Sequence, residues 1–420
     1  MKILMVGSGG REHALIRKLK ESPKVNEVIC APGNGGISFD ASCFPVDASD
    51  INGMIELARQ QSVDIVFVAP DNPLAAGMVD AMEGAGIKAF GPHKSAAEIE
   101  SSKVFSKNLM KKYNIPTATY EVFDTPETAL EFIRVQNVYP TVIKADGLAL
   151  GKGVVIAETY REATDAINSI MKDKVFGDSG SKVVVEEFLT GPEVSVLAFT
   201  DSKTMVPMVS SMDHKRAYDG DTGPNTGGMG TISPNPYYDK NTAEYCLNNI
   251  FIPTMEAMNA EGRPFKGCLY FGLMLTPSGP RVIEYNARFG DPETQVIMPR
   301  LKTPLIDIIK AVILERLSEI HIKWDDNACA CVIIASGGYP GNYQKNLPIY
   351  GLNQNGQLNG VSVYHSGTKA TENGFVTNGG RVLGITAVGA NTKEALKKAY
   401  SAVNNIKFEN SFFRTDIGSV

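Results

Sequence analysis

The chain has 420 residues, which predicts roughly two to four domains, and 43% of them are hydrophobic, enough for a sizeable core. The formal net charge of −5 argues against a general binder of nucleic acids or membrane surfaces, and no apolar run approaches the length of a transmembrane span. The six cysteines show neither a CxxC pair nor zinc-ligand spacing, which predicts buried free thiols in a reducing cytoplasm.

The first 92 residues alternate hydrophobic strands with helical stretches. Lys2–Val6 is a strand, and the glycine-rich turn Gly7–His13 leads into a helix. This order predicts the phosphate-binding opening of a doubly wound parallel sheet, although a GxGGxE turn can also simply pack a helix on a strand. Further strands are predicted at 28–30, 64–69 and 86–90, each followed by a glycine- or proline-rich loop. The loops are expected to form one crevice for a phosphorylated small molecule, and a purely structural Rossmann-like domain is the alternative.

A helical pattern follows over 94–112, with Lys103 and Lys107 one turn apart. Lysine pairs at this spacing usually lie on a solvated face, so both are expected to be exposed. A shorter helix is predicted over 127–134.

The next segment predicts a β-hairpin. Lys144 lies in a hydrophobic strand, a glycine-rich loop runs from Gly147 to Gly153, and a second strand starts at Val154. Backbone N–H groups of such a loop can cradle phosphates, and Lys144 would neutralise their charge. Because Gly153 follows Lys152 where a Walker loop has Ser or Thr, this is a different phosphate-binding device. A flexible, solvent-exposed hairpin is the alternative.

Three carboxylates mark the following two strands. Glu186 and Glu187 end the strand over 182–189, and Glu193 begins the strand that runs to 199. Carboxylates at these positions could meet the amino group of an adenine or the hydroxyls of a ribose, while the backbone pairs with the base. An ordinary pair of strand ends is the alternative.

A glycine-rich stretch over 219–230 follows the charged segment Asp213–Arg216. It is too long and too rich in glycine for a hairpin turn, and loops of this kind within a domain are usually active-site loops or disordered. The charged residues that introduce it favour an active-site loop.

The stretch Arg281–Glu293 carries the strongest chemical signal in the chain. Its strand over 282–286 is expected to pair with a strand over 267–275, and alternation places Glu284 and Asn286 on one face. A carboxylate and an amide oxygen are hard ligands that suit Mg²⁺, which leaves the rest of its shell to phosphates and water. Arg288 adds donors for a phosphate or carboxylate. We therefore predict a metal and phosphate centre here; a solvated edge strand is the alternative.

The remainder is predicted to form a helix over 305–317 and then a small α+β unit. Its strands lie at 328–335, 361–365 and 379–388, and a helix over 392–403 closes it. Its glycine loop Gly337–Gly341 either returns to the site or is a plain turn.

Taken together, the motifs resemble the ATP-grasp ligases and, among them, the phosphoribosylamine–glycine ligase family. The similarity runs along essentially the whole chain. It is carried by Gly7–Ala14, Ala31–Asn34, Val142–Gly147, Glu186–Leu189, Asp213–Arg216, Asp221–Gly230, Arg288–Glu293 and Gly337–Gly341. The resemblance implies an α/β and α+β multidomain fold of the monofunctional type. Its expected parts are a Rossmann-like N-terminal domain over 1–103, an ATP-grasp body over 104–325 with a mobile lid at about 122–190, and a small α+β C-terminal domain over 326–420.

The resemblance also implies residue roles. ATP would be bound by Lys103, Lys144, Glu186, Glu187, Leu189 and Glu193, and Mg²⁺, with Mn²⁺ as the alternative, by Glu284 and Asn286. The catalytic set would be Lys144, Asp213, Lys215, Arg288 and Asp291, with Asp213 and Arg288 also touching substrate. The other substrate contacts would be Gly9, Gly10, Arg11, Asn34, Gly35 and Asp71. Two positions depart from the family pattern: Asp71 stands where Glu is common, and Pro192 follows Gly191 where Glu often does.

The implied reaction belongs to de novo purine biosynthesis. ATP would phosphorylate glycine, and the amine of 5-phosphoribosylamine would attack the glycyl phosphate to give glycinamide ribonucleotide, ADP and phosphate. The expected partners are these small molecules, without nucleic acid or membrane, and the expected assembly is a cytoplasmic monomer, with a dimer as the alternative. Competing interpretations are a formate-dependent or carboxylating ATP-grasp enzyme, a nicotinamide dehydrogenase and a non-catalytic nucleotide-binding regulator.

Overall fold

The computed structural model describes residues 1–148 and 153–419, and its N-terminal part is a parallel sheet in the order β3-β2-β1-β4-β5. The strands are β1 (Lys2–Gly7), β2 (Glu27–Pro32), β3 (Ser42–Cys43), β4 (Ile65–Val68) and β5 (Ala89–Phe90). The helices are α1 (Gly10–Lys20), α2 (Ile51–Gln60), α3 (Asp71–Ala76), α4 (Met78–Gly84) and α5 (Lys94–Ser101). The predicted doubly wound parallel arrangement is confirmed.

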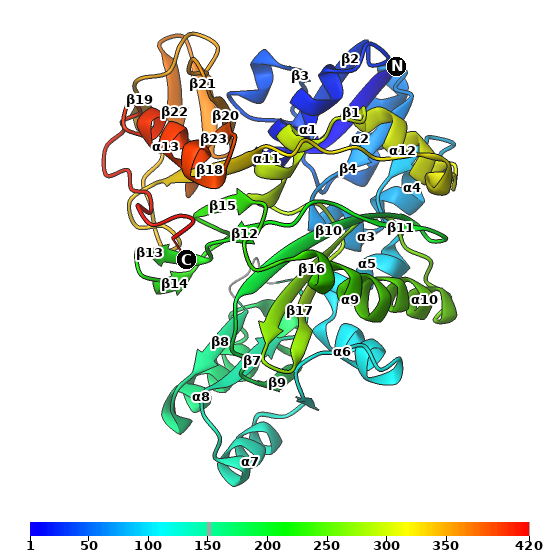
Figure 1. Ribbon diagram of the computed structural model, residues 1–420, viewed down its shortest axis with the longest axis vertical. Coiled ribbons are helices and arrows are strands. Elements are labelled where there is room, and N and C mark those ends of the chain that lie inside the picture. The colour runs from blue at the N-terminus through cyan, green and yellow to red at the C-terminus, as the bar shows by residue number, and fades with distance from the viewer. Residues whose placement is uncertain (149–152, 420) are drawn as a thin grey trace.

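The centre of the molecule is an antiparallel sheet in the order β11-β10-β16-β17, shown in green in Figure 1. Its strands are β10 (Glu193–Asp201), β11 (Met205–Pro207), β16 (Lys266–Thr276) and β17 (Gly279–Asn286). It shares a hydrophobic core with the N-terminal sheet and with helices α9 (Lys240–Cys246), α10 (Ile252–Ala260) and α12 (Leu305–Ile313). The expected pairing of the last two strands is confirmed, with Gly272 opposite Glu284 and Tyr270 opposite Asn286.

A second antiparallel sheet, in the order β6-β9-β7-β8, extends away from the centre (Figure 1). It comprises β6 (Tyr120–Phe123), β7 (Thr141–Ala145), β8 (Val154–Ala157) and β9 (Val183–Glu187), with helices α7 (Pro126–Gln136) and α8 (Tyr160–Ile167). This unit, called the lid here, has its own core around Ile143, Ile167 and Val185. The hairpin β7–β8 is as predicted, but the tip of its glycine loop, 149–152, lies outside the described residues.

Two elements differ from the sequence prediction. The single helix expected over 94–112 is divided into α5 and α6 (Lys103–Lys112), because Ser102 is extended and caps α6 by accepting a hydrogen bond from the Phe105 N–H at 3.0 Å. The stretch over 219–230 is not one long loop, since it contains β14 (Thr222–Asn225), which forms a hairpin with the preceding β13 (Arg216–Tyr218). Gly223 has φ +80° and packs against the Tyr218 ring, a conformation that favours glycine.

The C-terminal strands extend a sheet that begins in the body. The order is β12-β15-β18-β23-β20, where β12 (Met212–Asp213) and β15 (Gly230–Ser233) precede β18 (Ala328–Ala335), β20 (Ser362–His365) and β23 (Arg381–Gly389). Helix α13 (Thr392–Val403) covers it, and β19 (Pro348–Ile349), β22 (Gly374–Thr377) and β21 (Thr368–Thr371) form a small separate sheet. Figure 1 shows this unit in orange and red beside the N-terminal sheet. Within the described residues, no helix is both long and apolar enough to cross a membrane.

Candidate active site

The lid and the central sheet are joined by Lys144 on β7. Its Nζ donates to Glu186 Oε2 on β9 and to the backbone oxygen of Ile283 on β17, each at 3.0 Å. Lys144 is 4% exposed, so its charge is held inside the contact between the two sheets. This places it beside Glu284, the next residue of β17.

Glu186 also pairs with Lys107 at 2.9 Å. The expectation that Lys107 is solvated is wrong, because the side of α6 that carries it packs on the lid sheet and leaves it 2% exposed. Burial lowers the pKa of Lys107 to about 8, although the charge of Glu186 opposes the shift. Glu186 Oε1 is buried and has no hydrogen-bond partner among the described residues, so the carboxylate can still accept a bond from a ligand.

Glu284 lies among cations. Lys215 Nζ is 3.5 Å from Glu284 Oε1 and 3.0 Å from Glu193 Oε2, so this lysine bridges β10 and β17. Burial alone would raise the pKa of Glu284, but Lys215, Lys144 and Lys103 together hold it at about 2. The carboxylate is therefore ionised at neutral pH and sits in an excess of positive charge.

Glu284 and Asn286 flank a residue that points the other way. Tyr285 is 4% exposed and packs on Phe271 in the core, with ring centroids 5.5 Å apart. Because side chains alternate along a strand, the two oxygen-bearing neighbours of Tyr285 lie on the opposite face, toward the lid. The predicted common face is thus present in the structure.

Lys103 begins α6 and contacts the glycine loop of the lid. Its Nζ donates to the Gly147 backbone oxygen at 2.8 Å, while Asp146 Oδ1 accepts from Ser102 Oγ at 3.0 Å and from the Val104 N–H at 3.2 Å. The base of the hairpin is therefore docked on the start of α6.

Arg288 follows β17 and joins three polar groups. Its Nη2 lies 3.0 Å from Glu100 Oε1 and 3.7 Å from Asp71 Oδ2, and donates to Asn286 Oδ1 at 3.2 Å. Arg288 Nε is buried, and no group within residues 1–148 and 153–419 accepts a hydrogen bond from it. Asp71 comes from the start of α3, so Arg288 connects a loop of the N-terminal sheet with the strand of Glu284. Sequence reasoning did not single out Glu100, whose partner is distant in the chain.

Asp213 and Glu293 form a carboxyl pair deeper in the site. Thr231 Oγ1 donates to Asp213 Oδ1, and Ser195 Oγ donates to Glu293 Oε1, both at 3.3 Å. Burial raises the pKa of both carboxyls, and the charge of Glu293 raises that of Asp213 further. The pKa values of this pair are therefore shifted in the direction opposite to that of Glu284.

A second cluster surrounds the start of α1. The Gly9 N–H donates to Glu12 Oε2 at 2.6 Å, which explains the Glu of the GxGGxE pattern as a helix cap. Arg11 Nη1 donates to the Phe289 oxygen at 2.8 Å, and a Cβ on Gly9 would lie 3.3 Å from Asp291 Oδ2. The predicted residues Gly9, Gly10, Arg11 and Asp291 are thus brought together.

Two residues of this cluster were missed from the sequence. Arg381, at the start of β23, donates to the Asp291 oxygen at 2.7 Å and lies 3.6 Å from Asp291 Oδ2. Gln295 Nε2 donates to Asp291 Oδ1 at 2.6 Å, whereas its Oε1 is buried without a partner in the part of the chain that the structure describes. The C-terminal loop also reaches this region, because the Gly227 N–H donates to the Tyr339 hydroxyl at 3.0 Å.

Four predicted residues contribute differently. Asn34 uses its side chain within the protein, donating to the oxygens of Ser8 at 2.8 Å and His365 at 2.7 Å, so it shapes the loop. The Gly35 N–H donates to the Thr368 oxygen at 3.0 Å. Glu187 pairs with Arg281 at 3.0 Å at the surface, and Leu189 follows β9 half-buried.

The described residues contain no cluster of three or more His, Cys, Asp or Glu side chains suited to a metal ion. The predicted pair of Glu284 and Asn286 offers one carboxylate and one amide oxygen, a set that suits an ion taking most of its ligands from phosphates and water, as Mg²⁺ does.

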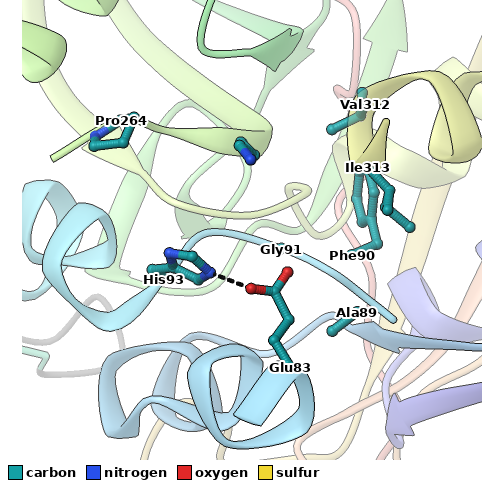
Figure 2. Close-up of a pocket in the computed structure, with 9 residues that line it drawn as sticks. Glu83, Ala89, Phe90, Gly91, His93, Pro264, Val312 and Ile313 are labelled. Atoms are coloured by element: carbon teal, nitrogen blue, oxygen red, sulfur yellow. Dashed lines mark hydrogen bonds and ion pairs between the residues drawn. The ribbon is translucent and has the colours of Figure 1, made fainter. Parts of the chain in front are cut away.

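A small pocket away from these clusters lies between α4, β5 and α12 (Figure 2). His93 Nε2 and Glu83 Oε2 are 2.7 Å apart there, and the rest of its wall includes Phe90, Val312 and Ile313. None of the predicted site residues lines it, so it is separate from the clusters above.

The lid sheet and the central sheet enclose buried lysines, and strand β17 carries Glu284 and Asn286. This arrangement defines the class of the protein, an ATP-grasp enzyme. Three family models of phosphoribosylglycinamide synthetase match the chain: the N domain over 1–100, the ATP-grasp (A) domain over 101–294 and the C domain over 329–420. The chain belongs to the phosphoribosylglycinamide synthetase family.

Individual relatives agree with this assignment. The phosphoribosylamine–glycine ligase of Caldanaerobacter subterraneus is 47% identical over 419 residues, covering 100% of both chains. The crystal structure of the Thermotoga maritima phosphoribosylamine–glycine ligase is 32% identical with a TM-score of 0.86, again covering 100% of both chains. The biotin carboxylase domain of Hydrogenobacter thermophilus 2-oxoglutarate carboxylase, solved with MgADP, shares the fold at 15% identity, with a TM-score of 0.75 over 98% of this chain and 91% of that one.

Proposed function

We propose a reaction path and a set of residue roles for the ligation that this family performs. The chain is an ATP-dependent ligase that joins glycine to 5-phosphoribosylamine in purine biosynthesis, since it matches phosphoribosylamine–glycine ligases at 44–47% identity over nearly its whole length. The proposed path runs through glycyl phosphate. A carboxylate is a poor electrophile, and conversion to an acyl phosphate gives it a leaving group.

The proposed nucleotide site lies between the lid and the central sheet. Lys103 and Lys144 contact the phosphates of ATP, Glu193 binds the ribose, and the end of β9 from Glu186 to Leu189 binds the adenine. The free Oε1 of Glu186 supports the adenine contact, because an exocyclic amino group would supply the donor that this buried oxygen lacks.

The metal site is proposed to consist of Glu284 and Asn286, with Mg²⁺ as the ion and Mn²⁺ as an alternative. The ionised state of Glu284 and the shared face of the two side chains fit a hard divalent cation. When bound, such an ion neutralises charge on the transferring phosphate. The MgADP in the Hydrogenobacter structure is consistent with this choice on a common fold.

Glycine and the acyl phosphate are proposed to lie between Arg288, Lys215 and Asp213. The buried, unpartnered Nε of Arg288 is the observation that carries this placement, since an anionic oxygen would supply its acceptor. Lys215 lies beside Glu284 and can follow the phosphate during transfer. Most of the catalysis would then come from positioning and charge neutralisation.

The amine substrate is proposed to bind at the cluster around α1, with Gly9, Gly10, Arg11, Gly35 and Asp71 forming its walls. The start of a helix is suited to a phosphate. Asp291 helps to hold this cluster against the body, and the unpartnered Oε1 of Gln295 offers an acceptor for a hydroxyl or amine. Asn34 acts here through the shape of its loop.

The function is tested by measuring ADP and phosphate release with ATP, glycine and phosphoribosylamine each omitted in turn. We expect sustained release of ADP and phosphate only when all three compounds are present. ATP and glycine without phosphoribosylamine should give at most slow release through hydrolysis of the intermediate. Formate- or bicarbonate-dependent release would point to another ATP-grasp reaction, and contradict the proposal.

We further propose that the enzyme acts as a cytoplasmic monomer. All six cysteines, each within the described residues, are free thiols, which suits a reducing compartment. Light scattering coupled to gel filtration should give a mass near 45.3 kDa, and a mass of twice that would indicate the dimer.

A further inference from the structure

Glu100 is a buried carboxylate to which the proposed mechanism assigns no role. It lies at the end of α5 and is 6% exposed. Its Oε2 accepts the Ala287 N–H at 2.7 Å, and its Oε1 lies 3.0 Å from Arg288 Nη2. Both carboxylate oxygens of Glu100 thus contact the two residues that follow Asn286, which are Ala287 and Arg288. Buried ion pairs add little net stability, so stability alone gives no reason for this one.

The same Nη2 of Arg288 links Glu100 to the proposed metal ligand, since it also donates to Asn286 Oδ1 at 3.2 Å. Arginine has no acceptor, so this contact requires the oxygen of the Asn286 amide to face the guanidinium. The carbonyl oxygen has a second lone pair, which stays available to a cation. The orientation of the ligand atom is therefore set by a guanidinium that Glu100 holds in place.

Charge gives Glu100 a second effect on the same site. Arg288 and a divalent cation would both lie next to Asn286, and two cations at that separation repel each other. The carboxyl groups of Glu100 and Asp71 both lie beside the guanidinium, and negative charge on them offsets this repulsion. Of the two, Glu100 makes the shorter contact, and it also fixes the backbone at Ala287. Burial raises the pKa of Glu100, and the charge of Arg288 opposes that shift.

We propose that Glu100 is a positioning residue for the metal site: through Arg288 and the Ala287 backbone it orients Asn286 toward the cation. The inference rests on the proposed metal ligands Glu284 and Asn286. Groups that orient metal ligands typically change metal affinity or activity by about 10–100-fold when they are removed.

The test measures ADP binding by calorimetry with and without Mg²⁺, so that the readout is the strengthening of ADP binding by the ion. Glu100→Gln keeps the shape and removes the charge. We expect it to reduce the Mg²⁺-dependent gain in affinity about tenfold, with ADP affinity in the absence of Mg²⁺ unchanged. The matched control is Glu98→Gln on the same helix, whose carboxylate pairs with Arg263 and should leave both affinities as in the wild type.

The outcomes for three variants decide the inference. An unchanged Mg²⁺ gain in Glu100→Gln, or an equal loss of ADP affinity with and without the ion, overturns it. Glu100→Asp keeps the charge but shortens the side chain. It should fold even if the Gln variant does not, and it should lose part of the Mg²⁺-dependent gain in ADP affinity. Glu284→Ala separates the proposed role of Glu100 from the proposed metal site. If Glu284→Ala also retains the full Mg²⁺-dependent gain in ADP affinity, the metal site itself is misplaced. If Glu284→Ala loses the gain and Glu100→Gln retains it, only the role of Glu100 is removed.

Discussion

The nucleotide side and the amine side of the site are held together in different ways. On the nucleotide side, charges face each other across two sheets, as Lys144 does with Glu186 and Lys215 with Glu284. On the amine side, the loop of Asn34 is held by neutral hydrogen bonds, and the imidazole of His13 accepts the His365 N–H at 2.8 Å. A charged site can exchange its internal partners for phosphates and a metal ion, whereas a loop held by neutral hydrogen bonds, as that of Asn34 is, has its shape fixed before the substrate arrives.

The largest expected effect comes from removing a charge on the nucleotide side. Glu284→Ala deletes the proposed metal ligand and leaves Lys215 and Lys144 without its counter-charge. We expect glycine-dependent ADP release to fall about 10³-fold in kcat/KM, equivalent to about 4 kcal/mol of transition-state stabilisation. Steady-state kinetics over a range of Mg²⁺ concentrations measures this.

The control for that variant is Glu56→Ala, an exposed carboxylate on α2, which should keep wild-type kinetics. Near-normal activity of Glu284→Ala at low Mg²⁺ would remove the metal role from this strand.

A smaller effect is expected from changing shape on the amine side. A Cβ at Gly35 would lie 2.6 Å from the Ala370 backbone nitrogen, so Gly35→Ala must push the loop away from β21. We expect KM for phosphoribosylamine to rise about tenfold while the affinity for MgADP stays unchanged, because the nucleotide side is untouched.

Gly84→Ala is the matched control, since nothing lies within 4 Å of a Cβ at Gly84. A Gly35→Ala variant that loses MgADP binding as well would show that the two sides are not separable.

The third prediction concerns the acid stability of the amine side. Burial lowers the pKa of His365 from 6.5 to about 3, so the folded state keeps it neutral while the unfolded chain takes up a proton below pH 6.5. Stability from this group is therefore complete above pH 6.5 and falls as the pH drops toward 3, by about 1.4 kcal/mol per pH unit. Urea unfolding between pH 7 and pH 4 should show a shallower pH dependence for His365→Gln than for the wild type. Equal slopes would mean that His365 is protonated in the folded protein.

The sequence was informative where the signal is local. Strand alternation identified the shared face of Glu284 and Asn286, and the glycine turn identified the first βαβ unit, because both patterns depend on neighbours along the chain. The parallel N-terminal sheet, the ATP-grasp body and the C-terminal α+β unit followed from the same kind of pattern and from the family motifs.

Two of the missed residues, Glu100 and Arg381, depend on distant partners, whereas Gln295 bonds Asp291 only four residues away. Glu100 bonds a backbone group 187 residues away, and Arg381 bonds one 90 residues away. No spacing within a helix or strand encodes such contacts. The prediction that Lys107 is solvated fails for the same reason. Helical spacing indicates that Lys103 is its neighbour, but it contains no information about Glu186 on the lid. The break at Ser102 is not marked by a helix-breaking residue, because the segment 94–112 contains neither Gly nor Pro.

The most direct test of the account is the position of the metal ion. A crystal structure with ADP and Mn²⁺, recorded so that the anomalous signal of manganese locates the ion, would place it relative to β17. We predict a manganese peak within about 2.0–2.4 Å of an oxygen of Glu284 and of Asn286 Oδ1, with the ADP phosphates completing its shell. A peak bound elsewhere, with Glu284 still paired only to Lys215, would contradict the account.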